Sequence, residues 1–181
     1  IYFGFIYMEN VKLIDIVMLG HRKFAGKDTL GNLLVEGKIE GVPKHSRLAF
    51  ADALKSHCGQ IFGLTREQMH GDHKEIVDPR YNKTPRYLMQ WFGTKMREID
   101  PDIWANIVAR KIEEELDARD TWSGCVQSSF VITDFRFPNE ANAIKRWIET
   151  LPSDYKVSLK QVRVDRPSLP PLDPNDHESE T

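Results

Sequence analysis

Leu13-Ile14-Asp15-Ile16-Val17-Met18-Leu19 is an almost continuously apolar run, and Gly26-Lys27-Asp28-Thr29 follows it after a short loop. The apolar stretch over Val11–Leu19 predicts a strand that is buried on both faces, as strands of parallel sheets are. A helix is expected next, from about Lys27 to Glu36, ending near Gly37. Backbone N–H groups at a helix N-terminus carry partial positive charge, so this strand–loop–helix order favours binding of nucleotide phosphates.

The charge of Lys27 strengthens this interpretation, because a lysine beside those N–H groups suits the β- and γ-phosphates of ATP. The loop differs from a standard Walker A loop, in which four residues separate the two glycines. Here five residues separate Gly20 from Gly26, and Asp28 follows the lysine, so the hydroxyl is displaced to Thr29. For this segment alone, an ordinary strand–turn–helix with a surface lysine is the alternative.

Bulk composition is that of a single globular domain. The chain has 181 residues, of which 40% are hydrophobic and 29% are charged, both ordinary values. A net charge of −2 gives no overall basic field that would attract a nucleic acid polymer or an anionic membrane. No apolar stretch approaches the length of a membrane helix, and two cysteines are too few for a disulfide framework. We therefore expect a cytoplasmic protein, with Met8 as the natural start and residues 1–7 as a non-native or upstream segment.

Helices and strands alternate along the rest of the chain. This order predicts an α/β domain with a mainly parallel sheet, spanning residues 8–181. The expected elements are a strand over Ser46–Phe50, a helix capped by Asp52 and running to Ile61, a capping box at Thr65–Gln68, a mobile loop over Gly71–Lys83, helices starting at Thr84-Pro85 and Asp100-Pro101, a strand over Phe130–Thr133, a helix over Pro138–Ile148 and a strand over Val157–Val164. In the helix after Asp100, a core-facing stripe recurs every four residues at Trp104, Val108, Ile112 and Leu116.

An acidic motif, Asp134-Phe135-Arg136-Phe137-Pro138-Asn139-Glu140, directly follows the strand predicted over Phe130–Thr133. Ligands of open α/β sheets bind at the carboxyl ends of the strands, so Asp134 is well placed to meet a magnesium–nucleotide complex. The alternative is structural: Asp134 caps the helix that follows, and Arg136 pairs with Glu140.

A second polar cluster lies on the helix predicted after Thr84. Arg86, Gln90 and Arg97 stand at i, i+4 and i+11, which places them on one helical face. Two guanidinium groups and an amide on one face can bind a monophosphate and read the edge of a base. The alternative is a solvated basic face, with the apolar residues Leu88, Trp91 and Phe92 in the core.

Taken together, these motifs resemble the deoxynucleoside monophosphate kinases of tailed bacteriophages, a branch of the P-loop kinases akin to adenylate kinase. The resemblance spans nearly all of residues 11–181. It rests on five stretches in this order: Gly26-Lys27-Asp28-Thr29, Phe50-Ala51-Asp52-Ala53-Leu54-Lys55, Thr84 to Arg97, Asp134 to Glu140, and His177-Glu178-Ser179-Glu180.

The resemblance implies a three-layer P-loop kinase fold that transfers the γ-phosphoryl group of ATP to a deoxynucleoside 5′-monophosphate, with Mg²⁺. Residues of about 65–100 would form a helical acceptor-binding region, and residues of about 165–181 a lid and an incomplete C-terminus. The implied catalytic residues are Lys27, Asp134, Arg136 and Arg97. ATP would contact Gly26, Lys27, Asp28, Thr29 and Arg166; the acceptor would contact Lys55, Arg86, Gln90 and Arg97; and magnesium would lie near Asp28, Thr29 and Asp134.

Two features depart from the family pattern: the extra residue before Gly26, and the lack of the strand and helix expected after the motif at His177. In contrast, the position of Thr29, two residues after Lys27, matches the Gly-Lys-Gly-Thr loop of adenylate kinase. Other P-loop kinases with small acceptors, such as dephospho-coenzyme A or phosphomevalonate kinase, and a non-catalytic nucleotide-binding module remain as alternatives. The preferred base and the oligomeric state, for which a homodimer is one option, are left open.

Overall fold

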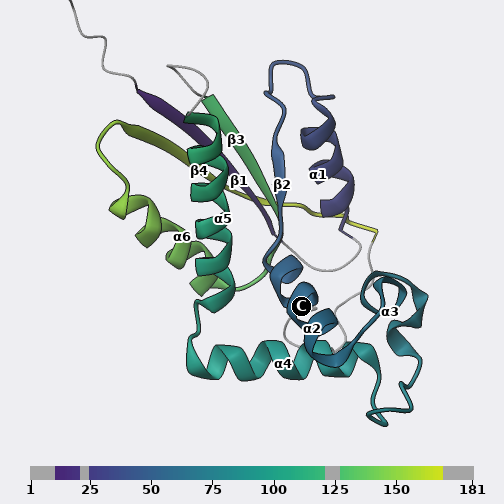
Figure 1. Ribbon diagram of the computed structural model, residues 1–181. Helices are drawn as coiled ribbons and strands as arrows, with labels where there is room; N and C mark the ends of the chain where they lie inside the picture. Colours follow the sequence, from purple (N-terminus) through teal and green to yellow (C-terminus); the bar gives the residue numbers. More distant parts are fainter. Residues whose placement is uncertain (1–10, 21–24, 121–126, 169–181) are drawn as a thin grey trace, which may run out of the picture.

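A four-stranded parallel sheet forms the centre of the computed structural model, which describes residues 11–20, 25–120 and 127–168. Its strands are β1 (Lys12–Gly20), β2 (Ser46–Leu48), β3 (Gln127–Phe135) and β4 (Tyr155–Arg163). They lie in the order β2-β3-β1-β4, and every neighbouring pair is parallel (Figure 1). The predicted α/β class with a mainly parallel sheet is confirmed.

Helices cover both faces of the sheet, giving three layers. Successive side chains of a strand point to opposite faces, and β1 follows this rule. Ile14, Ile16 and Met18 pack in one core cluster with residues of α5 (Ile103–Asp120) and α6 (Pro138–Thr150). On the other face, Val17 and Leu19 pack against Leu34 of α1 (Lys27–Glu36). The nearly continuous hydrophobicity of β1 therefore reflects burial on both sides.

The stripe predicted for α5 is confirmed. Trp104, Val108, Ile112 and Leu116 are all at most 7% exposed. The helix itself begins at Ile103 rather than at Pro101, because a side-chain oxygen of Asp100 accepts a hydrogen bond from the backbone of Asp102 and forms a separate turn.

Local helix signals between residues 65 and 99 are also confirmed. Thr65 and Gln68 form the predicted capping box of α3 (Arg66–His70). Thr84 caps α4 (Pro85–Ile99) by accepting from the backbone of Tyr87, with Pro85 in the first turn. These side chains satisfy backbone donors that lack a partner at the start of a helix.

The stretch Gly71–Lys83, predicted as a mobile loop, is instead held by polar contacts. It contains a short 3₁₀ helix, η1 (Asp72–Glu75), and a β-bridge between Asp78 and Lys83. The buried carboxylate of Asp78 accepts hydrogen bonds from the side chains of Gln68 and Arg80. Sequence periodicity missed this order because polar side chains, rather than an apolar face, produce it.

The connections leave β1 and β3 in opposite directions. The chain from β1 passes β3 to reach β2, whereas the chain from β3 passes β1 to reach β4. Open α/β sheets bind ligands at such a switch point, at the carboxyl ends of the strands. Figure 1 shows that α2 (Phe50–Phe62), α3 and α4 gather at this end of the sheet. Among the described residues, the helices are all too short or too polar to span a bilayer.

Candidate active site

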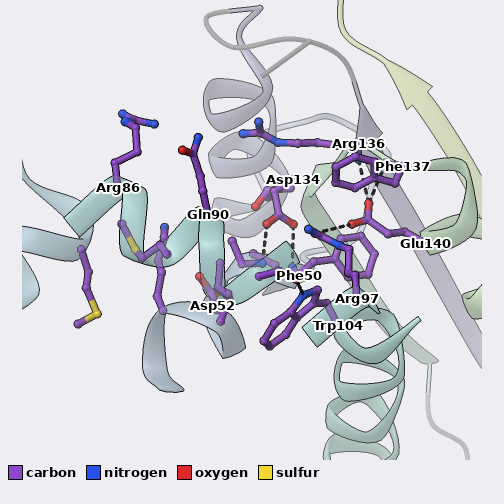
Figure 2. A pocket seen from close by; sticks show the side chains of 18 of the residues that line it. Phe50, Asp52, Arg86, Gln90, Arg97, Trp104, Asp134, Arg136, Phe137 and Glu140 are labelled. Atoms are coloured by element: carbon purple, nitrogen blue, oxygen red, sulfur yellow. Dashed lines mark hydrogen bonds and ion pairs between the residues drawn. The ribbon is translucent and has the colours of Figure 1, made fainter. Parts of the chain in front are cut away.

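A cavity of about 390 Å³ lies at the carboxyl end of the sheet (Figure 2). Its wall combines the end of β3, the start of α2, one face of α4, and parts of α1, α3 and η1. The sequence-predicted residues that line it are Asp28, Lys55, Arg86, Gln90, Arg97, Asp134 and Arg136. Motifs from four separate parts of the chain thus share one cavity.

Asp134 caps α2, an element more than eighty residues away in the sequence. Its two carboxylate oxygens accept hydrogen bonds from the backbone N–H groups of Phe50 and Ala51, each at 2.8 Å. The prediction that Asp52 caps this helix is therefore wrong: α2 begins at Phe50, and the N-cap residue Ala49 offers no side-chain hydrogen bond. The alternative in which Asp134 caps the following helix is wrong as well.

The environment of Asp134 opposes its charge. Burial raises the pKa of its carboxyl group above the ordinary value, and the nearby carboxylate of Asp52 acts in the same direction. The backbone donors at the start of α2 and the guanidinium of Arg136 act against this rise. A buried acid next to a second acid is typical of a site that meets a cation or cationic complex.

Glu140 organises the loop between β3 and α6. Its Oε2 atom accepts hydrogen bonds from the backbone N–H groups of Arg136 and Phe137, each at 3.0 Å. The side chain is almost fully buried, and burial raises its pKa to about 7. Arg136 thus contacts Glu140 through its backbone, while its side chain lines the cavity.

The polar face of α4 points into the cavity. Arg86, Gln90 and Arg97 all line it, and Figure 2 shows their side chains along one wall. Arg86 pairs with Glu75 of η1. A Cβ atom on Gly93 would lie 3.2 Å from Leu54 Cδ1, so the glycine permits α4 to pack closely against α2.

The alternative of a solvated basic face with an apolar core is only partly right. Leu88 is buried and Phe92 packs against the core, as expected, but Trp91 is 46% exposed. The outer face of α4 therefore carries an aromatic side chain, whereas the cationic face lines the cavity.

Sequence reasoning missed two cations of the cavity, Arg47 and Lys74. Both lie near Lys55, whose pKa is lowered by burial and by the repulsion of these two groups. Arg47 also pairs with Asp52 at 2.8 Å. A buried lysine whose charge is disfavoured by neighbouring cations suits an anionic ligand. No sequence signal marked Arg47, because its position depends on where β2 sits in the sheet.

The structure describes the predicted phosphate-binding loop only from residue 25 onward. Gly26 has a φ of 102°, a left-handed conformation that favours glycine, and its carbonyl accepts the first helical hydrogen bond, from Leu30. Lys27 is 8% exposed, whereas Thr29 is exposed. Gly26, Lys27 and Thr29 are not among the residues that line the cavity, although their neighbour Asp28 is.

Several sequence predictions fall outside the described residues. These are the extra residue of the loop at positions 21–24, the non-native segment at 1–7, most of the lid, and the motif from His177 to Glu180. Arg166 is described; it is exposed beyond β4 and does not line the cavity.

The donor set at the cavity fits magnesium bound mainly by phosphates. Mg²⁺ usually takes one or two carboxylates and completes its shell with water and substrate phosphate oxygens. Asp28 and Asp134 both line the cavity, and the described residues contain no cluster of three or more His, Cys, Asp or Glu side chains arranged to hold a metal on their own.

Comparison with known proteins supports a nucleotide kinase. No protein-family profile matches the chain. A protein of Acanthamoeba polyphaga mimivirus with the name "Putative deoxynucleotide monophosphate kinase" is 31% identical over 155 residues, which make up 81% of this chain and 72% of the relative. Since this similarity extends over most of both proteins and agrees with the parallel α/β sheet and its cavity, the chain belongs to the deoxynucleotide monophosphate kinase family.

Proposed function

We propose that this protein transfers the γ-phosphoryl group of ATP to a deoxynucleoside 5′-monophosphate, giving a deoxynucleoside diphosphate and ADP. One observation carries the proposal: the acidic end of β3 and the cationic face of α4 line the same cavity at the switch point of the sheet. Phosphoryl transfer depends on aligning two phosphate groups and neutralising their charge, and this cavity offers both acidic and cationic groups.

The donor side of the reaction is assigned to the start of α1 and the end of β3. Lys27 and the backbone of Gly26 would hold the β- and γ-phosphates of ATP. Asp28, Thr29 and Asp134 would hold magnesium, directly or through water, and the ion when bound neutralises phosphate charge. The role of Thr29 rests on the family resemblance alone, because its side chain is exposed and lies outside the cavity wall.

The acceptor side is assigned to α2 and α4. Lys55, Arg86 and Arg97 would bind the monophosphate, because guanidinium and ammonium groups pair well with phosphate oxygens. Gln90 can read a base edge through its amide, and Met69 and Met89 add apolar surface to the same cavity wall. Arg136 would neutralise charge on either phosphate, and Arg166 would belong to a lid.

An ADP-release assay with a panel of acceptors tests this function. The panel contains ATP and Mg²⁺ with dGMP, dTMP or dCMP, and, for the alternative kinases, dephospho-coenzyme A or phosphomevalonate. We expect ADP to form only with one or more of the deoxynucleotides. ADP formation with another acceptor alone would assign the protein to a different kinase reaction, and ATP binding without turnover on any acceptor would indicate a nucleotide-binding module.

A further inference from the structure

Glu140 is a buried acid inside the cavity wall that the proposed reaction does not use. It is 3% exposed and lies in the first turn of α6. One of its oxygens accepts two backbone hydrogen bonds, from Arg136 and Phe137. Its other oxygen, Oε1, lies 3.9 Å from Nη2 of Arg97. A buried carboxylate with this set of neighbours links the loop after β3 to helix α4.

Two groups, one from the loop after β3 and one from the first turn of α6, face the guanidinium of Arg97. Glu140 provides the negative charge on one side, and the ring of Phe137 lies under the guanidinium with 4.6 Å between the ring centroid and Cζ. Figure 2 shows Arg97 directed toward both side chains. Because Glu140 also holds the backbone of Phe137, both contacts to Arg97 depend on the same carboxylate.

From this geometry we propose that Glu140 is a positioning residue, whose carboxylate holds Arg97 in the orientation that binds the phosphate of the acceptor nucleotide. The inference rests on the proposed function for the identity of that nucleotide. Arg97 has a long side chain with many rotamers, so fixing it before binding reduces the entropy that binding would otherwise cost. The charged groups that face Glu140 are Arg97 from α4 and Asp134 from β3.

Glu140→Gln tests the proposal, because glutamine keeps the shape and an acceptor oxygen but removes the charge. Glu149→Gln is the matched control: it makes the same change at an exposed position of the same helix. At pH 8, with the best acceptor among dGMP, dTMP and dCMP, we expect Glu140→Gln to raise the KM for the acceptor about tenfold. The KM for ATP and kcat should stay within about twofold to threefold of the wild-type values, and Glu149→Gln should behave as wild type.

A double-mutant cycle with Arg97→Gln shows whether Glu140 acts through Arg97. If it does, Glu140→Gln should cause little further loss of acceptor affinity once Arg97 is replaced, because coupled residues are not additive. Calorimetric binding of the same deoxynucleotide without ATP provides the readout independently of turnover, and a thermal melt confirms that each variant is folded.

Three outcomes would overturn the proposal: a wild-type acceptor KM in Glu140→Gln, equal increases in the KM values of both substrates, or losses that multiply in the double variant. Failure of the proposed function would look different. In that case the wild-type protein itself would show no turnover with any deoxynucleotide, whereas the binding cycle would still report on Glu140 and Arg97.

Discussion

Asp78 and Asp134 are two acids held by hydrogen bonds in opposite ways. Asp78 finds its partners nearby in the sequence: Arg80, whose hydrogen bonds hold the pKa of Asp78 well below the ordinary value, and Gln68. Asp134 binds the backbone of Phe50 and Ala51, 84 and 83 positions away, and burial raises its pKa.

This difference distinguishes an acid that stabilises the fold, Asp78, from an acid of the candidate active site, Asp134. The charge of Asp78 is balanced inside its own segment, where it holds the chain between α3 and α4. Asp134 lies in the cavity beside Asp52 and Glu140, and this arrangement disfavours the ionisation of Asp134 and of Glu140. Titratable groups whose surroundings disfavour the charged form cluster at functional sites. We therefore expect replacement of Asp78 to affect stability and replacement of Asp134 to affect turnover.

Among the residues assigned to the reaction, loss of the lysine at the start of α1 should have the largest effect. Lys27→Ala removes the positive charge assigned to the β- and γ-phosphates and should lower kcat by about 10³-fold or more. Lys38→Ala, at an exposed lysine just beyond α1, is the control and should retain wild-type turnover. Steady-state ADP release measures both, and a folded Lys27→Ala variant with normal turnover would remove Lys27 from the mechanism.

Asp134→Asn should reduce both turnover and stability. It removes the charge assigned to the magnesium–nucleotide complex, and we expect kcat/KM to fall about 10²-fold. An amide has only one acceptor oxygen for the two backbone donors, so the free energy of unfolding should fall by about 1 kcal/mol. Kinetics and urea denaturation measure the two effects. A stability loss without a loss of turnover would show that Asp134 is only a helix cap.

Asp78→Asn should reduce stability without reducing turnover. It breaks the ion pair with Arg80 and should lower the melting temperature, while kcat stays within about twofold of wild type, because the residue lies outside the cavity wall. Arg80→Gln removes the partner and should lower the melting temperature in the same way. Differential scanning fluorimetry and the ADP assay test this, and a large loss of turnover at normal stability would contradict the distinction between the two acids.

The pH dependence of stability should show that Glu140, like Asp134, lies in an environment that disfavours its charged form. Its pKa is about 7 in the folded protein, against an ordinary value of 4.5, so the folded state binds the proton more tightly. The stabilisation from this group is complete below pH 4.5 and is lost as the pH rises through 7. Relative to Glu140→Gln, the wild-type free energy of unfolding should therefore fall between pH 5 and pH 8, by on the order of 2 kcal/mol.

Urea denaturation of both proteins at several pH values measures this difference. Parallel pH profiles would show that Glu140 titrates normally. The expected result has a functional side, because the ionised form that destabilises the fold is the form proposed to position Arg97. Sites that bind charged ligands often reduce stability in this way.

Sequence reasoning succeeded where the relevant contacts are local. The cap at Thr84, the capping box at Thr65 and the stripe on α5 depend on neighbours within one or two helical turns, so their patterns are visible in the sequence. The parallel α/β sheet followed from the order of such elements. The same reasoning placed Arg86, Gln90 and Arg97 on one face.

Sequence reasoning failed where a side chain contacts residues that are distant in the sequence. The start of α2 is set by Asp134, so a search for a nearby cap selected Asp52 instead. The cavity positions of Arg47 and Lys74 depend on β2 and η1 being brought to the same end of the sheet. Glu140 was read only as a partner of Arg136, because its contact with Arg97 joins two helices that the sequence does not show to be neighbours.

The cap formed by Asp134 makes the first turn of α2 a reporter on the cavity. The amide protons of Phe50 and Ala51 are protected by the same carboxylate that is assigned to the magnesium–nucleotide complex. A ligand that draws the oxygens of Asp134 toward itself would weaken that protection, whereas one that fixes Asp134 in place would strengthen it. Hydrogen exchange at two backbone amides can therefore follow occupancy of the donor site without any measurement of catalysis.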